Sequence, residues 1–364
     1  MKTITTTYYF GTNYGATLQA YALQQTIKSL GHENEILDIV SVPEKAKGDF
    51  SPIQLIKKWY IRYLSFKRRR QCAILRQHFA DFHKRYMGFT RKYASMDELR
   101  SDPKSLEYDC LITGSDQVWN LRTKPDFVDS RLLLFGSKSS RRFSYAASLE
   151  ELNYTEEQKD RVKEALRHFN GISLREESAR VYIESFTGLK CERIIDPVFL
   201  LSKEDWTKLA RNPRIQGPYI LCYQVLRNTR MEEVAYRLKE ATGYPIVSIC
   251  NSSIRWIRAD YTFFDVSIEE FLGFYSHAAF IVSASFHGVA MGLVFEKPVY
   301  AMVKNIRADR IRNLMNIMNL QSYIVVQDTK DEIVEYDRVK IEQMKAIIEE
   351  EREKGIDFLR KMLS

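Results

Sequence analysis

The stretch FIVSASFHGVAMGLVF, residues 280–295, contains the strand-to-helix transition on which the fold assignment depends. The apolar run Phe280–Val282 predicts a buried strand, and the apolar run after Gly288 predicts the helix that follows it. His287 is therefore expected in the turn between them. In open parallel sheets such turns lie at the carboxyl ends of the strands, where ligands bind and helix N-termini offer unpaired N–H groups to anions. A histidine here is either part of a ligand site or a hydrogen-bonded structural residue.

Similar strand-then-helix units recur along the whole chain. One series begins with the alternating stretch at residues 3–10, and a second begins with the apolar stretch at residues 218–225. Strands that alternate with helices indicate parallel sheets, so we expect an α/β fold with two Rossmann-like domains. The expected units are an N-terminal α/β domain over residues 1–204, a C-terminal α/β domain over 205–330, and a long charged helix within 331–364 that packs back across the junction.

Length and composition agree with two domains. At 364 residues the chain exceeds the size at which a single core stops growing, and its 45% hydrophobic content is enough to fill two cores. The N-terminus lacks the basic and apolar regions of a signal peptide and no apolar run is long enough to span a membrane, so we expect a cytoplasmic protein. The five scattered cysteines form no CxxC pair and have no histidine at metal spacing, which predicts reduced core residues and no metal site.

Much of the net charge of +8 lies in the segment Lys57–Arg70, KKWYIRYLSFKRRR. Its pattern is typical of an amphipathic helix with a basic side. A solvated basic helix is one interpretation. Peripheral contact with the inner face of an anionic membrane is the second, because each basic residue near anionic lipid contributes about 1 kcal/mol. Nucleic acid is not expected as a partner, since no nucleic-acid motif accompanies the charge.

Three polar side chains follow predicted strands at the point where each strand ends. Asp116 stands in LITGSDQVWN, Arg175 in ISLREES, and His287 in the stretch quoted above. Since the carboxyl ends of parallel strands share one edge of a sheet, we expect a common site there. The alternative for each is structural: a helix cap for Asp116, a surface ion pair with Glu176 or Glu177 for Arg175, and a bond to a backbone carbonyl for His287. Asn13 and Gly15, in the first predicted turn, add a fourth position.

A guanidinium, an imidazole and helix N-termini together suit a small anionic substrate. Arginine binds phosphate or carboxylate through two parallel hydrogen bonds, and histidine exchanges a proton near neutral pH. FGTNYG does not match the dinucleotide fingerprint GxGxxG, and neither the P-loop motif nor the hydrolase elbow GxSxG occurs. Dinucleotide-binding, P-loop and α/β-hydrolase functions are therefore not expected.

A set of motifs distributed over residues 5–320 resembles the polysaccharide pyruvyl transferase family. In the family's order the motifs are NYGATLQAYALQQTIKSLGH from Asn13, ITGSDQVWN from Ile112, SYAAS from Ser144, SLREES from Ser173, DPVFLL from Asp196, SFHGVAMGLVFEKP from Ser285 and DRIRNLM from Asp309. The resemblance implies a fold similar to GT-B glycosyltransferases, with a ligand cleft between two domains. It also implies transfer of a pyruvyl group from phosphoenolpyruvate to two hydroxyls of a sugar in a bacterial surface polysaccharide or its precursor. The product is a cyclic ketal, and no cofactor is required.

Matched residue by residue, Arg175 corresponds to the family arginine associated with donor binding, and His287 to the histidine near the reacting carbon. Family members often carry Arg-x-His where this chain has Ser285-Phe286-His287. Without that arginine the donor site is weaker unless another residue supplies the positive charge. The candidates in the following loop are Arg310, Lys304 and Arg307.

The resemblance and the positions of the residues together suggest roles. We expect His287 to act as general acid or to stabilise the leaving phosphate, and Asp116 to orient or deprotonate an acceptor hydroxyl. The remaining expected substrate-binding residues lie in the turns and helix starts: Asn13, Gly15, Ser285, Gly288 and Arg310. Two alternatives stay open, a nucleotide-sugar-dependent glycosyltransferase of the same fold and a non-catalytic member that binds a glycan. The acceptor sugar itself, which is nucleotide-linked, lipid-linked or free, is not identified.

Overall fold

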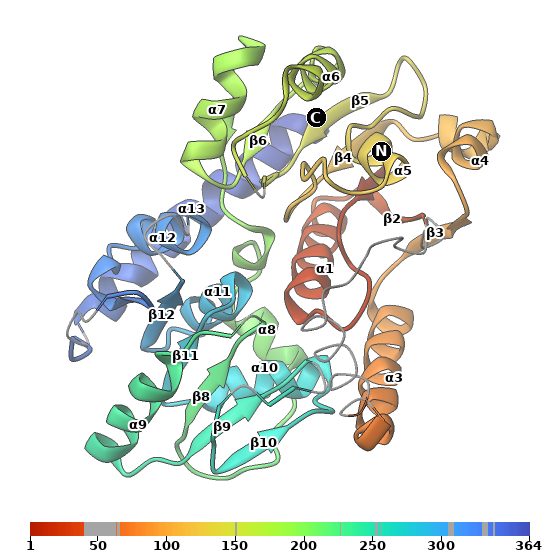
Figure 1. Ribbon diagram of the computed structural model, residues 1–364. Helices are drawn as coiled ribbons and strands as arrows, with labels where there is room; N and C mark the ends of the chain where they lie inside the picture. The colour runs from red at the N-terminus through yellow and green to blue at the C-terminus, as the bar shows by residue number, and fades with distance from the viewer. Residues whose placement is uncertain are drawn as a thin grey trace, which may run out of the picture.

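The computed structural model describes residues 1–39, 63, 66–149, 151–225, 227–251, 254–255, 257–304, 309–329, 334–337 and 339–364. Two parallel sheets, each flanked by helices, follow one another along the chain (Figure 1). Most of the predicted basic helix Lys57–Arg70 lies outside the described residues. Among the residues that are described, no helix combines the length and the apolar character needed to cross a membrane.

The first sheet has the strand order β3-β2-β1-β4-β5, with every neighbouring pair parallel. Its strands are β1 (Lys2–Thr6), β2 (Glu33–Ile39), β3 (Phe89–Tyr93), β4 (Cys110–Thr113) and β5 (Arg141–Ser144). A short parallel pair, β6 (Ser173–Leu174) and β7 (Glu192–Arg193), extends the sheet beyond β5 through single bridges. Because the chain moves outward from β1 in one direction and from β4 in the other, the topological switch point lies between β1 and β4.

The helices of this half include α1 (Tyr14–Ser29), which begins where the side chain of Asn13 accepts a hydrogen bond from the backbone N–H of Ala16. The others are α3 (Arg69–Tyr86), α4 (Met96–Ser101), η1 (Pro103–Leu106), α5 (Pro125–Arg131), α6 (Glu156–Leu166), α7 (Glu177–Thr187) and η2 (Pro197–Phe199). The predicted strand over residues 3–10 is wrong beyond Thr6, because residues 7–13 leave the sheet as the loop that leads to α1.

The second sheet has the strand order β10-β9-β8-β11-β12-β13, again parallel throughout. Its strands are β8 (Ile220–Tyr223), β9 (Ile246–Ile249), β10 (Tyr261–Phe263), β11 (Phe280–Ser283), β12 (Val299–Val303) and β13 (Ile324–Val326). Its helices are α8 (Lys203–Leu209), α9 (Met231–Thr242), α10 (Ile268–His277), α11 (Phe286–Val294), α12 (Asp309–Ile317) and η3 (Gln321–Tyr323). This strand order places a second switch point between β8 and β11.

The start of α11 differs from the prediction. Ser285 is the N-cap, and its hydroxyl accepts a hydrogen bond from the N–H of Gly288 at 3.4 Å. The helix therefore begins at Phe286, before the glycine, and His287 is its second residue instead of a turn residue. A serine cap satisfies a helix N–H that would otherwise be unpaired, which explains the earlier start.

The last helix, α13 (Val339–Leu363), occupies most of the segment 331–364 in which a long helix was predicted, and begins at Val339. Figure 1 shows it running from beside α12 to the C-terminus near β5. In the C-terminal half, Lys345 pairs with Glu296 at 3.4 Å. In the N-terminal half, Glu351 accepts two hydrogen bonds of 2.6 Å from Arg193, and the Phe358 ring packs edge-on against that of Phe143. One helix thus contacts both halves.

Candidate functional site

The N-terminus of α1 meets the N-terminus of α11 where the two halves of the chain are in contact. A Cβ atom at Gly15 would lie 2.3 Å from Cγ of His287, so only glycine leaves room for the imidazole in this position. The first turn of α1, in the first half of the chain, therefore fixes the position of His287 in the second half.

Arg175, directly after β6, lies at the centre of a group of carboxylates. Its Nε is 2.8 Å from Oε1 of Glu176, its Nη1 is 2.8 Å from Oδ2 of Asp196, and its Nη2 is 3.6 Å from Oδ1 of Asp116. The ring of Phe286 covers the guanidinium, with the ring centroid 4.1 Å from Cζ. The side chain of Arg175 is only 2% exposed. We call Asp116, Glu176 and Asp196 the carboxylate cluster.

His287 joins this group through Asp196. Its Nε2 lies 3.5 Å from Oδ2 of Asp196, and its side chain is 10% exposed. Among the described residues, neither His287 Nε2 nor Arg175 Nη2 has a hydrogen-bond partner. Buried nitrogen atoms of this kind are nearly always hydrogen-bonded in native proteins. His287 Nε2 lies beside Asp196 and Arg175 Nη2 lies beside Asp116. Two such donors in one carboxylate cluster indicate a place for a ligand that accepts hydrogen bonds.

The ionisation of the cluster follows from its geometry. Burial raises the pKa of Asp196, but the positive charges of His287 and Arg175 outweigh burial and hold this pKa below its ordinary value. Burial lowers the pKa of Arg175, but the charges of Glu176, Asp196 and Asp116 outweigh burial and raise it. Asp196 is therefore an anion and Arg175 a cation at neutral pH.

Asp116 does not cap a helix, because the next helix, α5, begins only at Pro125. Its φ of +66° is a left-handed conformation that costs a residue with a side chain on the order of 1–3 kcal/mol and persists where surrounding structure enforces it. The enforcing contacts are backbone bonds, since the carbonyl of Asp116 accepts from the N–H groups of Val118 and Ser148. Its carboxylate is 15% exposed and faces the guanidinium of Arg175.

The other predicted site residues lie at or near the starts of helices α1, α11 and α12. Asn13 and Ser285 are the N-caps of α1 and α11. Gly288 serves close packing, because a Cβ there would lie 2.1 Å from Oγ of Ser283. Arg310 stands in the first turn of α12, one turn before Asn313, whose Nδ2 donates to the carbonyl of Arg175 at 3.4 Å. Of the further candidates for the missing charge, Lys304 is exposed and Arg307 lies outside the described residues.

Asp196, Glu176 and Phe286 were not predicted as site residues. A usable signal existed for Asp196, because it follows β7 as Asp116 follows β4. The sequence suggests Glu176 only as a surface partner of Arg175, whereas in the structure its side chain is buried and 4% exposed. Phe286 gave no signal, because an apolar residue that begins a helix looks like any core residue.

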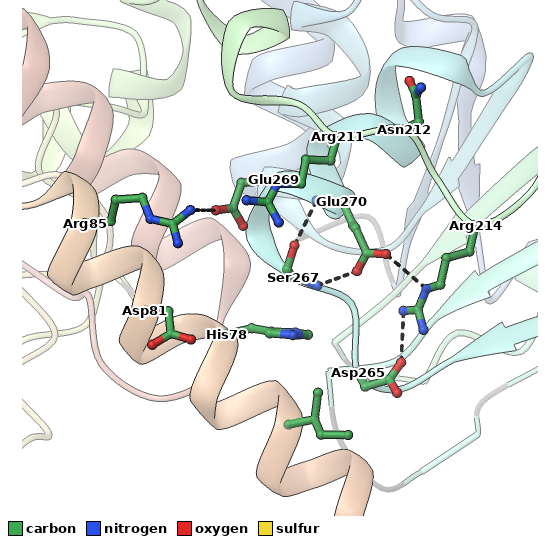
Figure 2. A pocket seen from close by; sticks show the side chains of 11 residues that line it. His78, Asp81, Arg85, Arg211, Asn212, Arg214, Asp265, Ser267, Glu269 and Glu270 are labelled. Atoms are coloured by element: carbon green, nitrogen blue, oxygen red, sulfur yellow. Dashed lines mark hydrogen bonds and ion pairs between the residues drawn. The ribbon is translucent and has the colours of Figure 1, made fainter.

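A separate polar cavity of about 400 Å³ lies between α3 and α10 (Figure 2). Most of its charged groups neutralise one another: Arg214 pairs with Asp265 at 2.9 Å and with Glu270 at 3.1 Å, and Arg85 lies 3.8 Å from Glu269. Since these pairs leave little unbalanced charge to direct a ligand, the arrangement at Arg175 and His287 is the stronger candidate site.

Comparison with known proteins supports the fold and gives the family. The structure resembles the UDP-GlcNAc 2-epimerase of Methanocaldococcus jannaschii, with a TM-score of 0.52 and 10% identity over 95% of this chain and 92% of the epimerase. A second structure from that organism, of the epimerase in complex with UDP-GlcNAc and UDP, gives a TM-score of 0.50 and 9% identity over 100% and 99% of the two chains. At such low identity the likeness shows a GT-B-like fold alone, as expected from the sequence.

A comparison with curated proteins found no similar sequence. The family described as polysaccharide pyruvyl transferase matches residues 13–303, a span that holds every predicted site residue except Arg310. The match covers most of both sheets and all of the carboxylate cluster. The chain therefore belongs to the polysaccharide pyruvyl transferase family.

Proposed function

We propose that the protein transfers a pyruvyl group from phosphoenolpyruvate to two hydroxyls of one sugar, which forms a cyclic ketal. The observation that carries the proposal is the pair of buried nitrogens without hydrogen-bond partners, His287 Nε2 beside Asp196 and Arg175 Nη2 beside Asp116. Phosphoenolpyruvate presents a phosphate and a carboxylate, which are the acceptors that such donors require. The family supplies the same reaction class.

The reaction balances with one donor and one diol. A proton added to the methylene carbon of phosphoenolpyruvate makes C2 electrophilic, and the first hydroxyl oxygen forms a bond to C2. The bond between C2 and the phosphate oxygen breaks, and the phosphate leaves with the electron pair. The second hydroxyl then closes the ketal at C2. The two hydroxyl protons end on the new methyl group and on the phosphate.

In this reaction His287 is the proposed proton carrier. Its Nε2 is the ring nitrogen near Asp196, and the anionic carboxylate stabilises the imidazolium that either donates a proton or faces the leaving phosphate. Arg175 is proposed to bind the donor through Nη2, because its other two nitrogens are already bonded to the carboxylate cluster. Both side chains are nearly buried, so we propose that the donor enters when the two halves of the chain move apart.

Asp116 is proposed to orient or deprotonate an acceptor hydroxyl. It follows β4 and lies within 3.6 Å of Arg175, so an acceptor beside it would be near the donor. We likewise propose residues 1–204 as the acceptor side and residues 205–330 as the donor side.

We also propose a cytoplasmic location and a peripheral membrane contact through Lys57–Arg70. Co-sedimentation with anionic vesicles at low and high salt tests the membrane contact.

Ser285 supports a second candidate function. It occupies the position where family members often have arginine, and its hydroxyl is used as a helix cap. A non-catalytic member that binds a glycan would tolerate this change. A nucleotide-sugar-dependent glycosyltransferase is the third reading, since the fold suits it as well.

One experiment separates the three readings. The melting temperature is measured with phosphoenolpyruvate, with UDP-sugars and with neither, and a sugar panel is then incubated with phosphoenolpyruvate and analysed by mass spectrometry. Stabilisation by phosphoenolpyruvate and a sugar product that carries one pyruvyl ketal are expected. Stabilisation by UDP-sugars alone would favour the glycosyltransferase, and no response to either donor would favour the glycan-binding protein.

A further inference from the structure

A pair of aromatic rings comes from the two segments that follow β1 and β4. Phe10, in the loop after β1, stacks on Phe127 of α5 with ring centroids 5.6 Å apart and an interplanar angle of 20°. The neighbouring Tyr9 is buried, whereas Phe10 is 42% exposed. We call Phe10 and Phe127 the aromatic platform. Phe127 is half-buried, so Phe10 is the exposed ring of the two. An exposed aromatic ring is a typical recognition element for a ligand.

A buried cation supports the platform from below. The guanidinium of Arg131 lies 4.9 Å from the ring centroid of Phe127 and 3.7 Å from that of Tyr8. Its Nη1 donates a hydrogen bond of 2.8 Å to Oη of Tyr8, and the residue is 1% exposed. The ring of Phe127 is thus held between Phe10 and Arg131. Its orientation is fixed before any ligand arrives.

The platform lies at the switch point of the first sheet. Phe10 follows β1 and Phe127 follows β4, the two adjacent strands between which the chain reverses its direction. Asp116 follows β4 directly, and its negative charge acts on the guanidinium of Arg131. The loop that carries Phe10 also reaches the second half of the chain, because Oγ1 of Thr12 donates to the carbonyl of Asn251 at 3.3 Å.

We infer that the aromatic platform is the acceptor subsite and that its occupant is a pyranose ring. A pyranose has one flat face of C–H groups, which packs on an exposed aromatic ring, and a rim of hydroxyls, which needs hydrogen-bonding groups beside that ring. Phe10 supplies the ring. Asp116, whose charge acts on the Arg131 guanidinium beside Phe127, supplies a carboxylate that accepts hydrogen bonds. The inference rests on the proposed function, since it names the residues that hold its sugar substrate.

The test uses binding of sugars in the absence of a donor. Methyl glycopyranosides of glucose, galactose and mannose serve as probes at millimolar concentration, and saturation-transfer NMR reports which sugar protons touch the protein. Transfer is expected to the axial C–H protons of one ring face. Phe10→Leu keeps the apolar volume but removes the aromatic face, and it should weaken binding about three- to tenfold. Phe10→Tyr should retain the binding.

Tyr261→Leu is the matched control, because Tyr261 is 48% exposed on β10, at the end of the molecule remote from α5 (Figure 1). It should leave the sugar signals unchanged. The inference is overturned if none of the probes receives saturation from the parent protein, or if Phe10→Leu binds them as the parent does. The melting temperature with phosphoenolpyruvate is measured on the same variants, so that failure of this inference can be told apart from failure of the proposed function. If the protein binds phosphoenolpyruvate but its sugar signals do not depend on Phe10, the proposed function stands and the acceptor subsite is refuted.

Discussion

Gly15 and His287 are in contact across the two halves of the chain, with room for a hydrogen but not for a methyl group between them: a Cβ on Gly15 would lie 2.3 Å from Cγ of the imidazole. The position of the histidine in the second half is therefore set by a glycine in the first half. Since His287 Nε2 also faces Asp196 of the first half, any change in the contact between the halves moves the proposed proton carrier.

Substitution of His287 should lower the turnover of phosphoenolpyruvate and leave the stability of the fold nearly unchanged. His287→Asn is expected to lower the turnover of phosphoenolpyruvate roughly 10²- to 10⁴-fold with little change in melting temperature, because a proton carrier is lost. Gly15→Ala should also lower turnover, and the double variant should be no slower than His287→Asn alone, since both act through the imidazole. Gly88→Ala is the control, because a Cβ at Gly88 meets only ordinary contacts of 3.6 Å or more. Turnover of His287→Asn at the parental rate would refute the role of the histidine.

Substitutions of Arg175 should separate its two roles. Arg175→Ala leaves Asp196 and Glu176 buried without their cation, so we expect a loss of about 3–5 kcal/mol in the free energy of unfolding. Arg175→Lys keeps the charge but loses the planar fork, and it should fold while the stabilising shift from phosphoenolpyruvate falls sharply. Urea denaturation measures the first effect and donor-dependent melting the second. An undiminished donor shift in Arg175→Lys would assign Arg175 to the structure of the cluster alone.

Stability should depend on pH through His83. Its ring packs among those of Tyr9, Phe79 and Phe89, and burial lowers its pKa from 6.5 to about 4. Above pH 6.5 both the folded and the unfolded chain hold a neutral histidine, so stability is undiminished. As the pH falls from 6.5 to 4, the unfolded chain takes up a proton that the folded chain does not, and stability falls.

The size of this effect is about 2 kcal/mol once partial exposure is allowed for. Urea denaturation at neutral pH and at about pH 4 measures it. His83→Gln should make the loss of stability over this range smaller by that amount, because glutamine does not titrate. The same pH dependence in His83→Gln and in the parent would contradict the assignment.

The last helix should be required for the stability of the whole chain. Phe358 is 3% exposed and packs on Phe143 and Tyr145 of the first half, so Phe358→Ala is expected to cost about 3–5 kcal/mol. Val339, at the start of the helix, is 62% exposed, and Val339→Ala should change the stability by less than about 0.5 kcal/mol. Thermal unfolding of both variants is the measurement. If Phe358→Ala melts at the same temperature as Val339→Ala, α13 does not stabilise the fold.

The sequence by itself determined the class of the fold and the edge of the sheets where the site lies. Hydrophobic period and turn residues are local properties of the sequence, so strands do end shortly before Asp116, Arg175 and His287, as predicted. Where local signals were weak or in competition, prediction failed. Because Ser285 caps the helix, α11 begins before the predicted residue. The aromatic residues after Thr6 continue the alternating pattern of a strand, although the strand itself ends at Thr6.

Only the tertiary structure decided which of these residues touch. Arg175 was predicted to meet a ligand through its guanidinium, yet three carboxylates occupy most of that guanidinium, and two of them lie 59 and 21 positions away in the chain. Contacts between such distant segments depend on how sheets and helices pack, and packing is not encoded in a local period. The same reason applies to Gly15, whose need to be glycine comes from an imidazole 272 positions later. The sequence placed both residues in turns that precede helices, and the folded chain brought them together.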